Sequence, residues 1–142
     1  MSKTSHPVPK PVPCPQPLPE AVLLGLACFN AGKYFEAHEH LELAWRAEKG
    51  PIRELYRGIL QVGVGYYHLK RGNLAGARKV FLRARRCLAG FPAVQCGIEI
   101  AGLLADVDRV EAAMQNDDRL GDRINAGLLR PLKYSSEPAD PE

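Results

Sequence analysis

The sequence predicts an all-α protein built from antiparallel helical hairpins, with about five helices. Apolar residues recur at three- and four-residue intervals through most of residues 18–115. Glycine, asparagine and proline interrupt this pattern at points that suit the turns between helices. The sequence shows no strict alternation of apolar and polar residues, which a half-buried strand would require.

Residues 1–17 are expected to form a disordered or extended, proline-rich tail. Proline occupies every second position from Pro7 to Pro19, which removes alternate backbone donors and favours polyproline II. Such a segment serves as a spacer or, alternatively, as a docking peptide for a partner domain.

The first helix is predicted to begin near Leu18 and to end at the turn of residues 30–32. The second covers residues 33–49, where apolar side chains repeat at helical spacing until Gly50 and Pro51 end the pattern. These two segments form the first antiparallel hairpin.

The third helix should be the central and most buried one. Pro51 suits its first turn, and the segment is apolar around most of its circumference as far as Gly72. Each glycine inside a helix costs about 1 kcal/mol relative to alanine. A neighbouring helix is therefore expected to approach closely at Gly58, Gly63 and Gly65.

Asn73 is predicted to cap the fourth helix. The apolar stripe of this helix lies opposite a basic side that is expected to face water, made of Arg78, Lys79, Arg85 and Arg86.

The fifth helix is predicted to begin near Pro92 and to complete a helical domain of residues 18–115. Residues 116–142 are expected to form a weakly ordered tail, because the periodic pattern breaks there. Three leucines of this tail are expected to dock back on the helices: Leu128, Leu129 and Leu132.

Composition limits the classes of function. The 142 residues suffice for one globular domain. A net charge of +3, with basic and acidic residues interleaved, does not favour nucleic-acid binding. The chain has no apolar run long enough for a membrane span and no secretory signal, so a cytoplasmic protein is expected. Buried or incidental thiols are expected from the unrelated spacings of Cys14, Cys28, Cys87 and Cys96.

The chain also shows an internal similarity at a shift of forty residues, which aligns "AGKYFEAHEHLELA" with "RGNLAGARKVFLRA". Gly32 then matches Gly72, and Leu41 matches Phe81. The order of glycine, aromatic and alanine positions resembles the tetratricopeptide repeat, although that repeat has a period of about thirty-four residues. The resemblance implies stacked helical hairpins.

A short motif on the second helix combines His38, Glu42 and Trp45 on or beside its apolar face. The segment "FNAGKYFEAHEHLELAW", continuing to "RGILQVGVGYYHLKRGN", resembles the family called domain of unknown function 309 over residues 25–90. That family is marked by His, three residues, Glu, two residues, then Trp or Tyr. The resemblance implies a tetratricopeptide-like helical fold and a suggested role in metal binding, and it implies no particular activity.

His38 and Glu42 lie one helical turn apart and can both donate to one divalent metal ion. A metal site would need further ligands, and Gln61 and His68 on the third helix are the candidates. Arg57 would oppose a cation and favour an anionic ligand. The alternative is a hydrogen-bonded His38–Glu42 pair worth about 0.2–0.5 kcal/mol that binds no ligand.

Three functions follow from these residues. The first is a pocket for a metal ion or small ligand between the second and third helices, shaped also by Trp45 and Tyr67, in which His38 or Glu42 could act as a general base. The second is a tetratricopeptide-like module that binds a protein or peptide partner without catalysis. The third is a helical homo-oligomer without a small ligand. The sequence leaves the choice open, including whether the protein is an enzyme.

Overall fold

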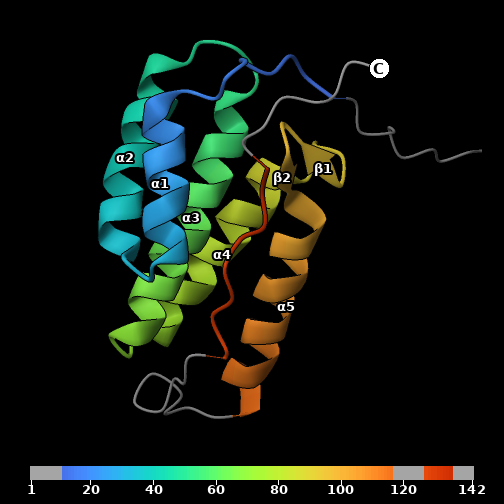
Figure 1. Cartoon of the computed structure of the whole chain (residues 1–142). Helices are drawn as coiled ribbons and strands as arrows, with labels where there is room; N and C mark the ends of the chain where they lie inside the picture. Colours follow the sequence, from blue (N-terminus) through green and yellow to red (C-terminus); the bar gives the residue numbers. More distant parts are fainter. Residues whose placement is uncertain (1–10, 117–126, 136–142) are drawn as a thin grey trace, which may run out of the picture.

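The computed structural model of the chain describes residues 11–116 and 127–135. This part of the chain folds into five helices and one short β-hairpin, which confirms the all-α class (Figure 1). None of the described helices is long and apolar enough to cross a membrane. The elements are α1 (Glu20–Asn30), α2 (Tyr34–Ala47), α3 (Arg53–Lys70), α4 (Leu74–Leu88), β1 (Val94–Gln95), β2 (Ile98–Glu99) and α5 (Ile100–Asn116).

The α3 helix is the centre of the molecule. It packs against α2 on one side and against α4 on the other, while α1 packs on α2 and α5 lies beyond α4 (Figure 1). Ten of its residues are buried, including Tyr56 and Tyr66, so the prediction that the third helix is the most buried one is confirmed. Burial raises the pKa of Tyr56 to about 12, so this phenol is neutral at physiological pH.

Glycines allow the helices of each hairpin to approach closely. A Cβ atom at Gly25 of α1 would lie 2.6 Å from Cγ of Leu41 on α2. A Cβ atom at Gly65 of α3 would overlap the ring of Phe81 on α4 in the same way. The two contacts are equivalent: Gly65 lies forty residues after Gly25, and Phe81 lies forty residues after Leu41. Gly58 likewise faces Leu88, so α4 explains two of the three glycines in α3.

The turns that end α1 and α3 also share one geometry. Gly32 and Gly72 both have a φ of +79°, in the left-handed region that glycine enters at little cost. After each glycine, the backbone N–H of Lys33 or Asn73 donates to a carbonyl five residues earlier, at 2.8 Å in both turns. These bonds satisfy carbonyl groups that the helix end leaves unpaired.

The start of α4 follows the sequence prediction, and one residue of its basic side has a further role. The side-chain oxygen of Asn73 accepts a hydrogen bond from the N–H of Gly76 at 2.9 Å, so Asn73 caps the helix as predicted. Arg85 on the basic side is partly exposed and is also paired with acids. Its guanidinium group lies 2.7 Å from both Asp108 and Glu111 of α5, and thus ties the two helices together.

The prediction that the fifth helix begins near Pro92 was wrong. Residues 94–99 form the antiparallel β1–β2 hairpin, and α5 begins only at Ile100. The hairpin turns at Cys96 and Gly97, whose φ angles of 57° and 77° both lie in the left-handed region. Such a two-residue turn reverses the chain within a few residues. Strands of two residues are too short to produce a recognisable alternation in the sequence.

Two side-chain amides hold the terminal segments against this framework. The carboxamide of Asn30 donates to the carbonyl of Leu132 at 2.9 Å and accepts from its N–H at 2.8 Å. Leu132 is buried, as expected for a leucine that docks back, and Leu128 and Leu129 pack against the core. At the other terminus, the carboxamide of the buried Gln95 pairs with the N–H and carbonyl of Val12, at 3.2 and 2.8 Å.

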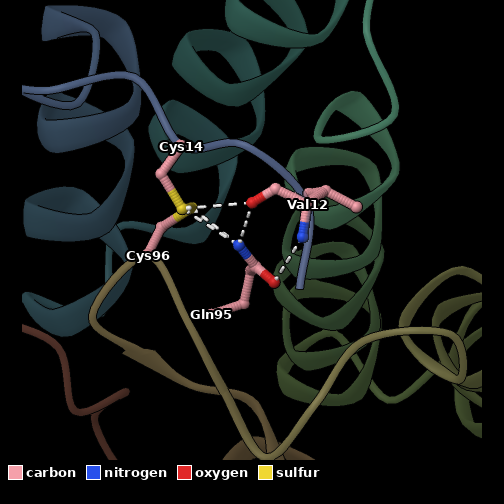
Figure 2. Close-up of a disulfide and its surroundings, with 4 residues drawn as sticks. All are labelled: Val12, Cys14, Gln95 and Cys96. Carbon is pink, nitrogen blue, oxygen red and sulfur yellow. Dashed lines mark hydrogen bonds between the residues drawn. A yellow bond between two sulfur atoms is a disulfide. The ribbon is translucent and has the colours of Figure 1, made fainter. Parts of the chain in front are cut away.

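A disulfide bond joins Cys14 to Cys96 beside the Gln95 contact (Figure 2). The expectation of free thiols was therefore wrong for these two residues and holds for Cys28 and Cys87. The two bonded cysteines lie 82 positions apart in sequence, and their Cα atoms come to 5.6 Å where the segment of Val12 and Cys14 lies against the hairpin. Sequence spacing contains no information about such a contact.

Two substitutions on α3 test the role of its glycines. We expect Gly65→Ala to lower the free energy of unfolding by about 1–3 kcal/mol, because the added methyl group would overlap Phe81. Gly63→Ala is the matched control: its Cβ would lie 3.5 Å from Phe29, an ordinary contact, so the better helix propensity should stabilise the protein by up to about 1 kcal/mol. Urea unfolding followed by circular dichroism measures both. Equal effects of the two variants would contradict this account.

The disulfide should contribute to stability by limiting the freedom of the unfolded chain. We expect Cys14→Ser to lower the free energy of unfolding by about 2–4 kcal/mol. A reducing agent should produce the same loss in the wild-type protein and no further loss in the variant. A wild-type protein whose urea midpoint is unchanged by reduction would show that the bond has no such role.

Candidate functional site

The motif on α2 forms a chain of three polar side chains. The Nε2 atom of His38 lies 3.3 Å from one carboxylate oxygen of Glu42, and the other oxygen lies 2.7 Å from the guanidinium group of Arg46. In the neutral imidazole, a proton on Nε2 donates to Glu42 and leaves Nδ1 as a hydrogen-bond acceptor. That Nδ1 atom is buried and has no partner among the described residues.

His38 also lines a small cavity between α2 and α3. The cavity has a volume of about 150 Å³, and its wall is largely aromatic. Its remaining lining residues are Tyr34, Phe35, Val64, Tyr67 and His68.

The two histidines of this wall present different groups. The Nδ1 atom of His68 lies 3.4 Å from the side-chain nitrogen of Asn73, the residue that caps α4. Because an amide nitrogen can only donate, Nδ1 of His68 is the acceptor, and the proton of a neutral ring lies on Nε2. The cavity wall thus contains two different imidazole groups. That of His38 has an unpaired acceptor at Nδ1, and that of His68 has an N–H donor at Nε2.

Aromatic rings and cations surround the cavity. Phe35 is half exposed, and its ring lies 5.8 Å from those of His38 and Tyr67. Arg71 lies 5.5 Å from the ring of Tyr67, and Lys70 lies 5.7 Å from the ring of Tyr34. Burial raises the pKa of Tyr34, so its hydroxyl stays neutral. The wall of the cavity is thus largely aromatic, and a cation lies beside two of its rings.

Trp45 lies apart from this cavity. The guanidinium groups of Arg53 and Arg57 lie 4.7 and 5.5 Å from its ring centre, and Arg53 also donates to its backbone carbonyl at 3.4 Å. Arg57 also lies 3.8 Å from a carboxylate oxygen of Glu54. Trp45 packs partly against the core, and its indole N–H is buried without a partner in the described part of the chain.

The predicted site residues thus separate into groups. The structure brings His38, His68 and Tyr67 to one cavity, and it places Glu42 behind His38. Trp45 and Arg57 form a separate stack, and Gln61 is half buried on α3 outside the cavity wall.

Three lining residues were not among the candidates predicted from the sequence: Tyr34, Phe35 and Val64. Their recurrence with the histidines at three- and four-residue spacing on two neighbouring helices was the available signal.

The donor set does not complete a metal site. His38 and Glu42 provide two donors, and Arg46 already holds one oxygen of the carboxylate. Across residues 11–116 and 127–135, no three His, Cys, Asp or Glu side chains gather as metal ligands would. A tightly held zinc ion normally needs three or four protein ligands. The described residues therefore do not fit a resident metal ion.

The fold and this site define a small protein of helical hairpins with an aromatic, histidine-lined cavity. Residues 22–80 match the model of the family described as "Domain of unknown function (DUF309)". The matched region extends from α1 into α4 and contains the whole motif of His38, Glu42 and Trp45. The resemblance inferred from the sequence is confirmed.

Two relatives extend this comparison. An uncharacterised protein of Bacillus subtilis (strain 168), YpuF, is 38% identical over 119 residues, which cover 81% of this chain and 66% of the relative. An uncharacterised protein of Aquifex aeolicus (strain VF5) is 31% identical over 94 residues, which cover 64% of this chain and 28% of the relative. The chain thus spans about two thirds of the first relative and just over a quarter of the second.

The stack on Trp45, the one tryptophan of the sequence, can be tested directly. We expect the double substitution of Arg53 and Arg57 with alanine to lower the free energy of unfolding by about 1–2 kcal/mol, because two cation–π contacts are lost. Tryptophan emission should shift to longer wavelength as the ring becomes more exposed. Arg46→Ala is the control, since Arg46 contacts Glu42 and should leave the emission unchanged. An unshifted spectrum in the double variant would argue against the stack.

Proposed function

We propose that the protein is a binding module that takes an apolar side chain of a partner protein or peptide into the cavity between α2 and α3. The observation that carries this proposal is the cavity itself, lined by four rings and one valine beside the motif histidine. Aromatic pockets of this kind accept the anchor residues that dominate binding energy at protein interfaces.

The size of the cavity favours a side chain over a free metabolite. Sites for small molecules usually measure about 300–1,000 Å³ and enclose most of the ligand. The volume of about 150 Å³ suits a single ring or branched aliphatic group. Phe35, half exposed at the mouth, would then cover part of the inserted group.

His38 would add selectivity to this apolar contact. Glu42 fixes the tautomer of the ring, and Nδ1 is left as a buried acceptor that would pair only with a donor of the bound segment that reaches it. A partner that leaves this buried acceptor unpaired would bind less tightly by about 1–3 kcal/mol. The motif therefore supports recognition without a metal ion or a chemical step.

The arrangement of hairpins supports the same class of function. We propose that α1–α2 and α3–α4 are two copies of one tetratricopeptide-like unit. The support lies in the equivalent close contacts at Gly25 and Gly65 and in the equivalent turns at Gly32 and Gly72. Stacked hairpins of this kind present extended surfaces to peptides and proteins.

Nuclear magnetic resonance can test occupancy of the cavity. In a titration with N-acetyl-phenylalanine amide, we expect shifts of the ring resonances of His38, Tyr67 and His68, because the added ring enters between them. N-acetyl-alanine amide should produce shifts at least several-fold smaller. Val64→Phe should suppress the response, since the larger side chain fills the cavity.

Leu43→Phe supplies the matched control, because Leu43 is exposed on another side of α2. A response that survives Val64→Phe, or that concentrates away from α2 and α3, would overturn the proposal. A bound divalent metal would give a different result: a rise in melting temperature on adding zinc that disappears in both His38→Ala and Glu42→Ala.

A further inference from the structure

The α4 helix carries an unusual concentration of positive charge. Leu74–Leu88 contains five cations and no acidic residue, although the whole chain has a net charge of only +3. Arg85 is neutralised by two carboxylates of α5. The other four are exposed and have no acidic partner within the described residues: Arg78, Lys79, Arg83 and Arg86.

An apolar side chain lies among these cations. Leu82 is 50% exposed, with Arg78 one turn before it and Arg86 one turn after it. Ala75 and Ala89 are also exposed and lie seven residues to either side of Leu82. Residues seven apart share one side of a helix. Ala75, Leu82 and Ala89 thus form a narrow apolar line bordered by the four unpaired cations. We call this surface the α4 face.

The α2 helix exposes the complementary pattern. Leu43 is 63% exposed, and no other large apolar side chain of the described residues is more exposed. Glu39 lies one turn before it, Glu36 lies two turns before it, and Ala47 lies one turn after it, all exposed. These four residues form the α2 face. Arg46 borders this face, and its guanidinium group forms an ion pair with Glu42 at 2.7 Å.

The charges of the α4 face have an energetic cost in the isolated protein. Lys79 and Arg83 are four residues apart and Arg83 and Arg86 are three apart, so like charges face one another on the helix surface. No carboxylate of the described residues forms an ion pair with these cations. An acidic surface placed against the α4 face would remove this repulsion and would cover Leu82 at the same time.

We propose that the α2 face of one copy of this protein docks against the α4 face of a second copy. Leu43 would meet Leu82, and Glu36 and Glu39 would pair with the cations of α4. The chain itself provides an apolar residue opposite an apolar residue and acids opposite bases, which is the complementarity that specific interfaces show. This surface uses other residues than the cavity, because none of Glu36, Glu39 and Leu43 lines the cavity.

A second copy explains more of the α4 face than a nucleic acid does. Phosphate groups would pair with the four cations and would leave Leu82 without a role. The α4 face also contains no aromatic residue on which a base could stack. An acidic segment of another protein would use the same contacts, and the experiment separates it from self-association.

Sedimentation equilibrium of the full chain in 50 mM sodium chloride tests the proposal. The average mass should rise above the monomer value of 15.6 kDa as the protein concentration increases towards millimolar. In 500 mM sodium chloride the association constant should fall at least tenfold, because salt screens the pairs. A monomer at all concentrations in low salt would overturn the proposal, and a different acidic partner would then be the remaining occupant of the α4 face.

Charge exchange between the two faces gives the sharper test. The variant Glu36→Lys/Glu39→Lys and the variant Arg83→Glu/Arg86→Glu should each lose self-association at least tenfold. An equimolar mixture of the two variants should associate again, because the unchanged α4 face of the first variant can dock against the unchanged α2 face of the second. Helical circular dichroism should remain as in the wild type, because all four positions are exposed.

The matched control is Arg130→Glu/Lys133→Glu, which changes the net charge by the same amount as the α4 variant at two exposed positions outside both faces. It should associate like the wild type. Equal loss in this control, or failure of the mixed variants to associate, would overturn the proposed interface and leave a general charge effect. Leu43→Asp should also abolish association, which a purely electrostatic contact would not require.

Discussion

The close packing of α3 between α2 and α4 determines the position of the other described elements. Gly58 and Gly65 leave room for Leu88 and Phe81, so α4 approaches nearer than larger residues would allow. On the opposite side α3 lies beside α2, and Gly25 brings α1 equally close to Leu41. Interiors packed at this density respond to a single added methyl group. The cavity lies at the edge of this core, where the α2–α3 interface reaches the surface.

The terminal segments are held by polar contacts of a different kind. Asn30 and Gln95 each use both atoms of a carboxamide to pair with the N–H and carbonyl of one backbone residue, Leu132 and Val12 respectively. Extended chain cannot satisfy these groups internally as a helix does. The disulfide adds a covalent link at the Val12 end, whereas at the Leu132 end β2 continues the pairing through an isolated bridge to Tyr134.

The α2 helix has three functional sides. One side carries Leu41 into the core, a second presents His38 and Phe35 to the cavity, and a third exposes Leu43 beside two glutamates. The cluster of histidines and glutamates in the sequence therefore consists of residues with different surroundings. Only the pair of His38 and Glu42 has the geometry of an oriented imidazole. The Nδ1 atom of that imidazole is buried and has no partner among the described residues. The proposed binding of a side chain and the proposed self-association thus use different residues of α2.

The sequence by itself determined the helical class, the central place of the third helix, the cap at Asn73 and the motif of the family. Each of these depends on local spacing, because a helix repeats its contacts every three or four residues. Only the tertiary structure decided the Cys14–Cys96 bond, the hairpin before α5 and the pairing of Arg85 with two acids. It also separated Trp45 and Gln61 from the cavity. These features arise from contacts between residues far apart in the chain and from the direction of individual side chains, which a local pattern does not encode.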